Sequence, residues 1–164
     1  MHAGISIQAT AKDELYAALA RQAEALLSGE HDLVANAANF AALVWQHLPR
    51  ISWCGFYFLQ SDGDLLVGPF QGKPACVRIA MGRGVCGTAA VTRHTQVVAD
   101  VNEFPGHIAC DPVSRSELVV PLLRPDGTLL GVWDVDSAEQ GRFDAIDKVG
   151  MEGLCRAFMG SLGN

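Results

Sequence analysis

The sequence predicts an α+β protein with a central antiparallel sheet, flanked by an N-terminal helical hairpin and a C-terminal helix. Apolar residues recur at helical spacing near both ends, whereas the middle of the chain is rich in aromatic and β-branched residues that favour strands. Short turns join these strands, so most of them pair as hairpins and not through helical crossovers. A chain of 164 residues suits one domain, expected over residues 1–164, with residues 1–12 as a candidate N-terminal arm.

Helices are expected at both ends of the chain. Residues 13–27 and 32–48 carry apolar side chains three or four positions apart. Gly29 ends the first of these helices and Pro49 ends the second. Two adjoining helices of this kind indicate a hairpin that lies on a flat surface. Residues 142–162 form the third helix, again with apolar residues near helical spacing.

The first half of the sheet is predicted between the N-terminal helices and the middle of the chain. Residues 51–59 are aromatic and β-prone, and the turn SDGD connects them to a second strand at residues 65–70. The short link implies an antiparallel hairpin. Residues 76–80 alternate apolar and other side chains, as a third strand does. A glycine-rich turn then leads into a short helix within residues 81–94.

The second half of the sheet follows a long irregular stretch. A short strand is expected within residues 95–101, and residues 102–116 have no regular pattern. Residues 117–123 and 129–137 read as a hairpin around the turn RPDGT. Pro121 cannot donate a hydrogen bond to a neighbouring strand, so it indicates a sheet edge or a bulge.

Composition and charge exclude several classes of protein. The formal net charge of −6 disfavours a nucleic-acid binder, which needs a basic surface. No segment approaches the roughly 18 consecutive apolar residues of a membrane span. The first residues lack the basic start and apolar core of a secretory signal, so the cytoplasm is the expected location. The five cysteines are an odd number, which argues against a structural disulfide framework and leaves core packing, metal binding or redox chemistry.

The stretch GRGVCG, residues 82–87, matches the glycine pattern of dinucleotide-binding loops. That function also needs a parallel βαβ unit and an acidic residue about 20 positions further on. The preceding strands pair as a hairpin and Asp100 follows too early, so we reject it. Instead, Gly84 opens a helix whose first N–H groups, from Val85 to Gly87, favour an anion. Cys86 lies in that first turn, where the helix dipole favours a thiolate; a tight turn with a buried cysteine is the alternative.

Three stretches together carry a resemblance to a known family. They read PACVRIAMGRGVCGTAA, DVNEFPGHIACDPVSRSELVVPL and GVWDVDS. This combination resembles the free methionine-(R)-sulfoxide reductases, catalytic members of the GAF-domain superfamily, whose pattern runs ACVRI, GVCGTA, FxGHIACD, SEIVVP and GVLDIDS. The resemblance covers nearly the whole chain and implies a GAF-like fold. Cys54 and Trp133 depart from the family's usual Ala and Leu, at positions without a family role.

The resemblance implies a cysteine-based reductase of free methionine-(R)-sulfoxide. A thiolate attacks the sulfoxide sulfur, the oxygen receives a proton, and the resulting sulfenic acid condenses with a second thiol. The resemblance assigns Cys110 as nucleophile and Cys76 as its resolving partner, and it leaves Cys86 as an alternative attacking or resolving thiol. An external dithiol, expected to be thioredoxin, recycles the disulfide, with no metal or organic cofactor. Cys54 and Cys155 are expected to be core residues.

A group of acidic residues is the candidate substrate site. Asp134 and Asp136 are two positions apart on a predicted strand, so their side chains share one face, and their proximity raises the pKa of one of them. A protonated carboxyl could deliver the proton, and an ionised one could bind the substrate's ammonium group. The resemblance makes Glu117, Asp134 and Asp136 the substrate-binding acids and gives Trp53 the wall for the substrate's methyl group. Apart from the resemblance, Ser116 is expected to place a hydroxyl near these acids. A solvated acidic pair and a core tryptophan are the structural alternatives.

Two other functions fit parts of the sequence. A non-catalytic GAF sensor would bind a small molecule, but such modules normally accompany an output domain and do not need these three cysteines. A zinc site could instead gather Cys76, Cys86, Cys110 and His107, whose residue types suit the metal. Otherwise His107 is expected to fix its loop. The oligomeric state stays open, with a homodimer as one option.

Overall fold

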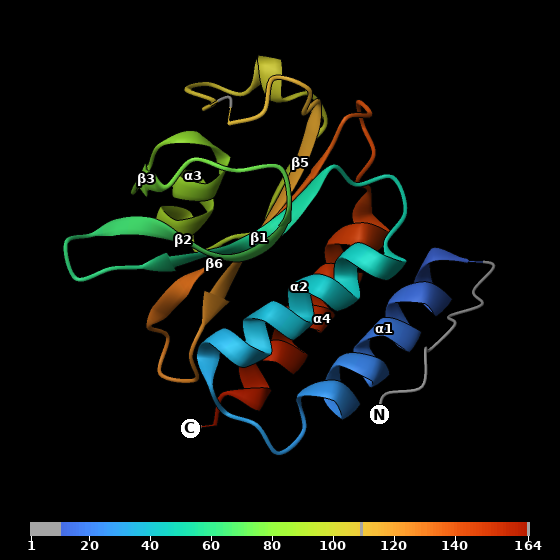
Figure 1. Cartoon of the computed structure of the whole chain (residues 1–164). Coiled ribbons are helices and arrows are strands. Elements are labelled where there is room, and N and C mark those ends of the chain that lie inside the picture. The colour runs from blue at the N-terminus through green and yellow to red at the C-terminus, as the bar shows by residue number, and fades with distance from the viewer. Residues whose placement is uncertain (1–10, 109, 164) are drawn as a thin grey trace.

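The computed structural model describes residues 11–108 and 110–163 and has the α+β architecture that the sequence predicts (Figure 1). The elements run in the order α1 (Lys12–Leu27), α2 (Leu33–His47), β1 (Trp53–Leu59), β2 (Asp64–Gly72), β3 (Arg78–Ala80), α3 (Gly84–Thr92), β4 (Gln96–Val98), the 3-10 helix η1 (Val101–Glu103), β5 (Ser116–Leu123), β6 (Leu129–Ser137) and α4 (Ala145–Ser161). Most of the proposed N-terminal arm lies outside the described residues. Within them, no helix is long and apolar enough to cross a membrane.

The six strands form one sheet in the order β3-β2-β1-β6-β5-β4. Both predicted hairpins, β1–β2 and β5–β6, are confirmed as antiparallel pairs, and β1 pairs with β6 at the centre of the sheet. Pro121 pairs with Val132 of β6, but β4 reaches only from Glu117 to Val119 of β5. The missing N–H of Pro121 therefore faces a local edge, as its sequence position suggested.

Each face of the sheet has its own apolar core. Helices α2 and α4 cover one face, and α1 packs against these two helices (Figure 1). In this core Phe40 packs edge-on against Trp133 with 4.8 Å between ring centroids. Helix α3 lies on the other face, above a smaller core that includes Val119 and Val132. Because side chains alternate along β6, Trp133 enters the first core and Asp134 points to the α3 side. The same alternation therefore places the acidic pair beneath α3.

The third strand is shorter than the sequence suggested. Residues 76–80 were expected to be extended and paired, but β3 begins at Arg78, so Cys76 lies in an irregular connection. The carbonyl of Cys76 accepts a hydrogen bond of 3.0 Å from the Tyr57 hydroxyl, a side-chain partner in place of a strand neighbour. Cys76 is thereby held over the α3 side of the sheet.

The glycines of residues 82–87 allow a close backbone contact between the turn and α3. Gly82 donates its N–H to the carbonyl of Gly87 over 3.0 Å, and a Cβ on Gly87 would lie 2.5 Å from the carbonyl oxygen of Ala80. Gly84 has φ +61°, which favours glycine. Gly87 donates its own N–H to the carbonyl of Arg83, so the prediction of a free N–H at that position is wrong.

Candidate active site

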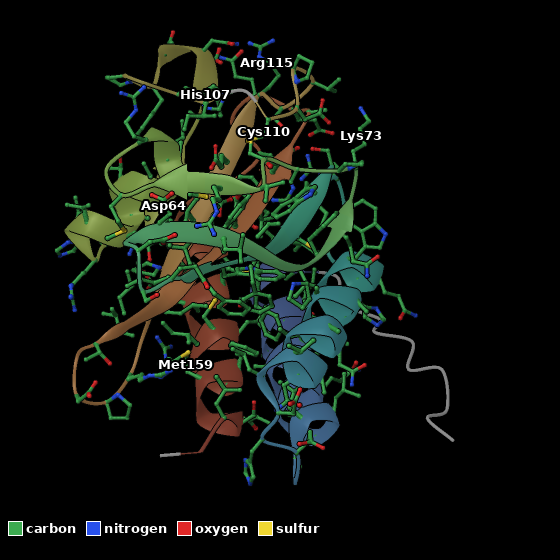
Figure 2. All side chains as sticks on the ribbon, turned by 60° about the vertical axis from the view of Figure 1, so that its left-hand side comes forward. Asp64, Lys73, His107, Cys110, Arg115 and Met159 are labelled. Carbon is green, nitrogen blue, oxygen red and sulfur yellow. A yellow bond between two sulfur atoms is a disulfide. The ribbon has the colours of Figure 1, made fainter. Side chains whose placement is uncertain are left out.

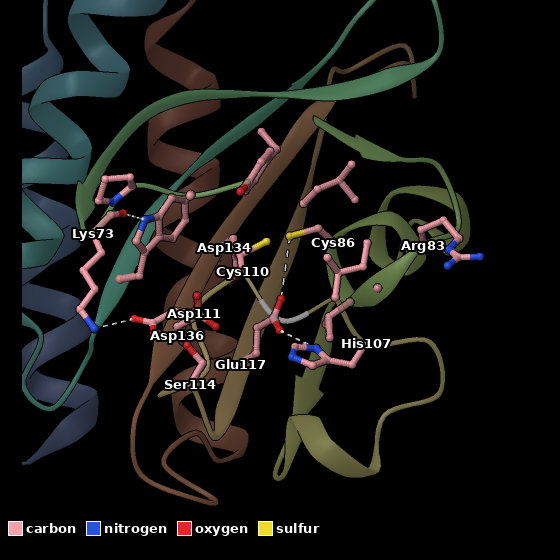
Figure 3. Close-up of a pocket in the computed structure, with 18 residues that line it drawn as sticks. Lys73, Arg83, Cys86, His107, Cys110, Asp111, Ser114, Glu117, Asp134 and Asp136 are labelled. Atoms are coloured by element: carbon pink, nitrogen blue, oxygen red, sulfur yellow. Dashed lines mark hydrogen bonds and ion pairs between the residues drawn. The ribbon is translucent and has the colours of Figure 1, made fainter. Parts of the chain in front are cut away.

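A pocket lies on the α3 side of the sheet (Figure 3). Strands β1, β5 and β6 form its base, the first turn of α3 forms one wall, and two irregular connections, residues 73–77 and the described part of 104–115 (104–108 and 110–115), close it. Six of the seven candidate residues line it: Trp53, Cys86, Cys110, Glu117, Asp134 and Asp136. The seventh, Cys76, is bonded to Cys110.

The disulfide between Cys76 and Cys110 joins the two irregular connections. The Cα atoms of the two residues are 5.4 Å apart. An ion pair of 3.2 Å between Lys73 Nζ and Asp111 Oδ2 links the same two connections (Figure 3). The pair of thiols that the family resemblance pointed to is thus brought together at the pocket wall, from positions 34 residues apart.

Three candidate residues form one row across the sheet. Trp53 of β1 is paired with Asp136 of β6, which is paired in turn with Glu117 of β5. Directly paired residues project to the same face of a sheet, so all three side chains reach the pocket. Asp134 follows two positions before Asp136 on β6 and projects the same way. Strand register therefore brings Trp53 and the three acids to one pocket.

Glu117 and Asp134 are buried, and Asp136 is partly buried beside them. Among the described residues, no lysine or arginine forms an ion pair with Glu117, Asp134 or Asp136. Burial raises the pKa of Asp134 to about 7, and burial followed by repulsion from Asp134 raises the pKa of Glu117 and of Asp136 well above the ordinary value. The buried Oδ1 atom of Asp134 has no hydrogen-bond partner within the described part of the chain. The pocket is therefore prepared for a positively charged or proton-accepting ligand.

Cys86 projects from the first turn of α3 onto these acids. Its Sγ donates to Oε1 of Glu117 at 3.9 Å (Figure 3). Burial, together with the neighbouring Asp134 and Glu117, raises the pKa of this thiol well above its ordinary value. The prediction that the helix start favours a thiolate here is therefore wrong, because desolvation outweighs the helix dipole.

The Trp53 ring lies along the base of the pocket in a fixed position. It stacks on Phe70 with 5.4 Å between ring centroids, and its Nε1 donates to the carbonyl of Lys73 over 3.1 Å. A Cβ on Gly55 would lie 2.6 Å from Cη2 of Trp53, so only glycine leaves room for the ring. The ring thus offers an apolar surface beside the acids.

Comparison with known proteins identifies the family. The GAF-domain profile matches residues 30–157. A free methionine-R-sulfoxide reductase of Escherichia coli is 49% identical over 143 residues, which is 87% of this chain and 86% of the relative. The free methionine-R-sulfoxide reductase of Neisseria meningitidis, solved with its substrate, superposes with a TM-score of 0.93 at 41% identity, covering 99% of this chain and 96% of that one. The chain belongs to this reductase family.

A further relative bears on the alternative function, that of a non-catalytic GAF sensor. A protein of Burkholderia vietnamiensis, named as a GAF sensor, is 61% identical and superposes with a TM-score of 0.90, covering 94% of this chain and all of that one. This relative is as similar in fold as the reductases. The redox pair at the pocket wall is the feature that a ligand sensor does not require.

Ser116 and His107 lie in places the sequence did not predict. The Ser116 hydroxyl donates to the carbonyl of Glu139 over 2.6 Å, and Ser114 is the serine that lines the pocket. His107 lines the pocket too, with Nδ1 4.0 Å from Oε2 of Glu117 (Figure 3).

The remaining cysteines behave as the sequence predicts or are accounted for by the disulfide. Cys54 of β1 and Cys155 of α4 are buried in the core between the sheet and the helices, as expected. Two of the four residues of the suggested zinc set are joined in the disulfide, so that set is not available in this form.

Sequence reasoning missed several pocket residues. Tyr57, Lys73 and Asp111 line the pocket. Tyr57 stands four positions after Trp53 on the same strand, so the two-residue period of a strand could have identified it. Lys73 and Asp111 come from irregular connections, where no period places a side chain.

Proposed function

We propose that this chain reduces free L-methionine-(R)-sulfoxide to methionine, with Cys110 as the attacking thiol and Cys76 as the resolving thiol. The observation that carries the proposal is the Cys76–Cys110 disulfide at the wall of a pocket lined by buried acids. Two relatives at 49% and 44% identity carry the name free methionine-R-sulfoxide reductase, and a third, at 41% identity, was solved with its substrate.

The reaction balances with two thiols and an external dithiol. The sulfur of Cys110 bonds to the sulfoxide sulfur, the oxygen passes to Cys110, and methionine leaves with Cys110 as a sulfenic acid. The Cys76 thiol then attacks that sulfenic acid, which releases water and forms the disulfide. A dithiol reduces this disulfide and becomes oxidised itself. The short Cα separation of Cys76 and Cys110 supports the second step, because little backbone movement is needed.

The acids would divide two tasks between them. The pKa of Asp134, near 7, suits a carboxyl that hydrogen-bonds the sulfoxide oxygen and gives it a proton. Glu117 and Asp136 flank it and would bind the substrate's ammonium group once one of them ionises. The Trp53 ring would contact the methyl group. This division is supported by the single pocket that all four side chains line.

Selectivity for the free amino acid would follow from the substrate's two charges. The acids suit the ammonium group, and the first turn of α3, at Gly84 and Val85, offers a helix N-terminus to the carboxylate. A peptide-bound methionine sulfoxide has neither charge at that position. The assay is therefore reduction of free methionine-(R)-sulfoxide, its N-acetyl form and a peptide-bound form with dithiothreitol. We expect methionine from the first alone; equal rates on all three would contradict the proposal.

Thioredoxin is the proposed reductant, since the disulfide lies at a pocket wall formed by irregular segments. A reducing compartment, and so the cytoplasm, suits this cycle and the three buried free thiols. A homodimer is the proposed assembly. Consumption of reduced thioredoxin and the mass in solution test these points separately.

A sensor function makes a different prediction for the same pocket. It requires that the pocket bind a small molecule and that methionine sulfoxide stay unchanged, even with excess dithiol. The Burkholderia relative makes this the alternative to exclude. Binding without release of methionine would favour it over the reductase.

A further inference from the structure

Three donor groups that the disulfide does not use converge on one point of the pocket. Cys86 Sγ and one carboxylate oxygen each from Glu117 and Asp134 all lie within 4.8 Å of one another. They come from three different elements, α3, β5 and β6, so the sheet and the helix packed on it hold them together. All three side chains are buried and all three line the pocket, so an ion that enters the pocket can reach them.

This cluster contains one buried polar atom without a hydrogen-bond partner among the described residues, and a second such atom lies beside the cluster. Asp134 is only 6% exposed, and its Oδ1 accepts no hydrogen bond from any described residue. Nδ1 of His107 is likewise buried without a hydrogen-bond partner in the described part of the chain, and it lies 4.0 Å from Oε2 of Glu117 (Figure 3). Unpartnered buried polar atoms cost free energy, which a bound cation would recover.

We propose that the pocket also binds one zinc ion, through Cys86, Glu117 and Asp134, with the fourth position open to water. A thiolate ligand favours zinc over magnesium or calcium, which prefer six or more oxygen ligands. Ligand atoms of tetrahedral zinc lie about 3.3–3.7 Å apart, given metal–ligand distances of about 2.0–2.3 Å. The three ligand atoms lie within 4.8 Å of one another, with Cys86 Sγ 3.9 Å from Oε1 of Glu117, so side-chain rotations are needed to close the site. His107 is not one of the ligands, because its Nδ1 lies near the other oxygen of Glu117, Oε2.

This site differs from the zinc set suggested by the sequence. Cys76 and Cys110 take no part, because they are bonded to each other, and the acids replace them. Zinc binding displaces the proton of the Cys86 thiol to solvent, so the affinity rises with pH. No electron transfer is involved, and the redox state of Cys76 and Cys110 is unchanged.

Zinc bound at this cluster inhibits the reductase activity, and this consequence rests on the proposed function. The ion occupies the place of the substrate's ammonium group and ties up Asp134, so zinc and methionine sulfoxide exclude each other. Inhibition by zinc is therefore competitive with the substrate.

The test measures binding of Zn²⁺ to the oxidised protein, whose Cys76–Cys110 disulfide keeps those sulfurs away from the metal. Calorimetry should give one zinc per chain, and free methionine should weaken the binding. Co²⁺ in place of zinc should show the near-ultraviolet thiolate charge-transfer band. Cys86→Ala should abolish that band and lower the zinc affinity by more than the roughly 10–100-fold cost of losing a supporting contact. Asp134→Asn should also lower it, whereas Cys155→Ala, a buried thiol of the opposite core, should not.

A second protein keeps the test decisive if the disulfide blocks entry of the ion. In Cys76→Ser/Cys110→Ser the two connections are not covalently joined, and zinc should bind with the same dependence on Cys86. No zinc binding by either protein, or binding unaffected by Cys86→Ala, would overturn the site. Zinc binding without competition by methionine would overturn the inhibitory role. The binding assay needs no turnover, so a failure of the proposed reductase activity is recognised separately.

Discussion

The sulfur atoms of Cys76 and Cys110 are bonded, although the two residues are 34 positions apart and neither lies in a regular helix or strand. Figure 2 places Cys110 with His107 and Lys73 at one end of the molecule, away from Met159 of α4. The rigid sheet and the helices below it hold the acids, while the irregular connections carry the redox pair. A thiol on such connections can change partners during a cycle without disturbing either core.

Replacing each thiol of the pair should stop the reaction at a different step. Cys110→Ser should release no methionine even in a single turnover, because the attacking sulfur is absent. Cys76→Ser should release about one methionine per chain and then stall with thioredoxin, because the sulfenic acid has no resolving partner. Quantifying methionine per chain, with and without reductant, checks both. Cys155→Ala is the matched control and should cycle normally; a stall there would point to a general effect of thiol loss.

Trp53 should control substrate affinity through its ring. Trp53→Ala removes the apolar surface beside the acids and should lower kcat/KM by about 10–200-fold, as expected for 1–3 kcal/mol of apolar contact. Trp53→Phe keeps part of that surface but loses the hydrogen bond to Lys73, so its loss should be smaller. Steady-state kinetics on the free sulfoxide provide the comparison. Trp45→Ala changes a tryptophan of α2 that is 39% exposed and should have no effect on kcat/KM.

The buried acids should make the protein less stable as the pH rises. The pKa of Asp134 is raised from 3.8 to about 7 in the folded chain, so folding favours the protonated form. The stabilisation is complete below the ordinary carboxyl pKa and is lost as the pH rises toward 7. Above that pH, the free energy of unfolding of Asp134→Asn should exceed that of the parent by on the order of 1–4 kcal/mol. The variant should therefore unfold at a higher temperature, while losing activity.

Asp126, an exposed acid whose pKa is lowered and not raised, provides the control for this pH dependence. Hydrogen bonds from Thr128 lower the pKa of Asp126, so its contribution to stability is present above the ordinary carboxyl pKa and is lost in acid. Asp126→Asn should therefore be slightly less stable than the parent at neutral pH. Thermal melts of the parent, Asp134→Asn and Asp126→Asn from pH 4 to 8 show whether the two substitutions change the pH dependence of stability in opposite directions. A parent protein that gains stability against Asp134→Asn as the pH rises would contradict the raised pKa.

Gly87 should tolerate no side chain, whereas another helical glycine should accept one. In Gly87→Ala the new Cβ would lie 2.5 Å from the carbonyl oxygen of Ala80, which belongs to the backbone and cannot move aside freely. We expect a destabilisation of about 1–3 kcal/mol, as for other overpacked sites. In Gly153→Ala of α4 the nearest atom is 3.6 Å away, on the flexible Arg156 side chain, so a gain of about 0.5–1 kcal/mol is expected. Denaturant melts give both values, and equal effects at the two positions would refute the packing argument.

Local sequence patterns predicted the strands well where turn residues and alternating side chains mark the segment. Residues 129–137 were expected as a strand and form β6, because turn residues and alternation define such a segment. The placement of β1 beside β6 could not be predicted, since it joins segments far apart in the chain. That pairing brings Trp53 next to Asp136, so part of the site's geometry depends on information that no local pattern contains.

The misjudged protonation state of Cys86 has a similar origin. Its place in the first turn of α3 suggested a thiolate, since a helix N-terminus contributes about 0.3–1 kcal/mol to a nearby negative charge. Packing of α3 against β5 and β6 buries the thiol beside Glu117 and Asp134 instead. Removing a thiolate from water costs several kcal/mol, and two acids nearby add to it, so burial decides the outcome.

The most direct test of the reductase account is turnover of the two epimers of free methionine sulfoxide by the reduced protein with dithiothreitol. Methionine formed is separated and quantified against time, with Cys110→Ser as the background. The account predicts repeated turnover of the R epimer and background rates with the S epimer. Equal turnover of both epimers, or no methionine from the R epimer, would contradict it.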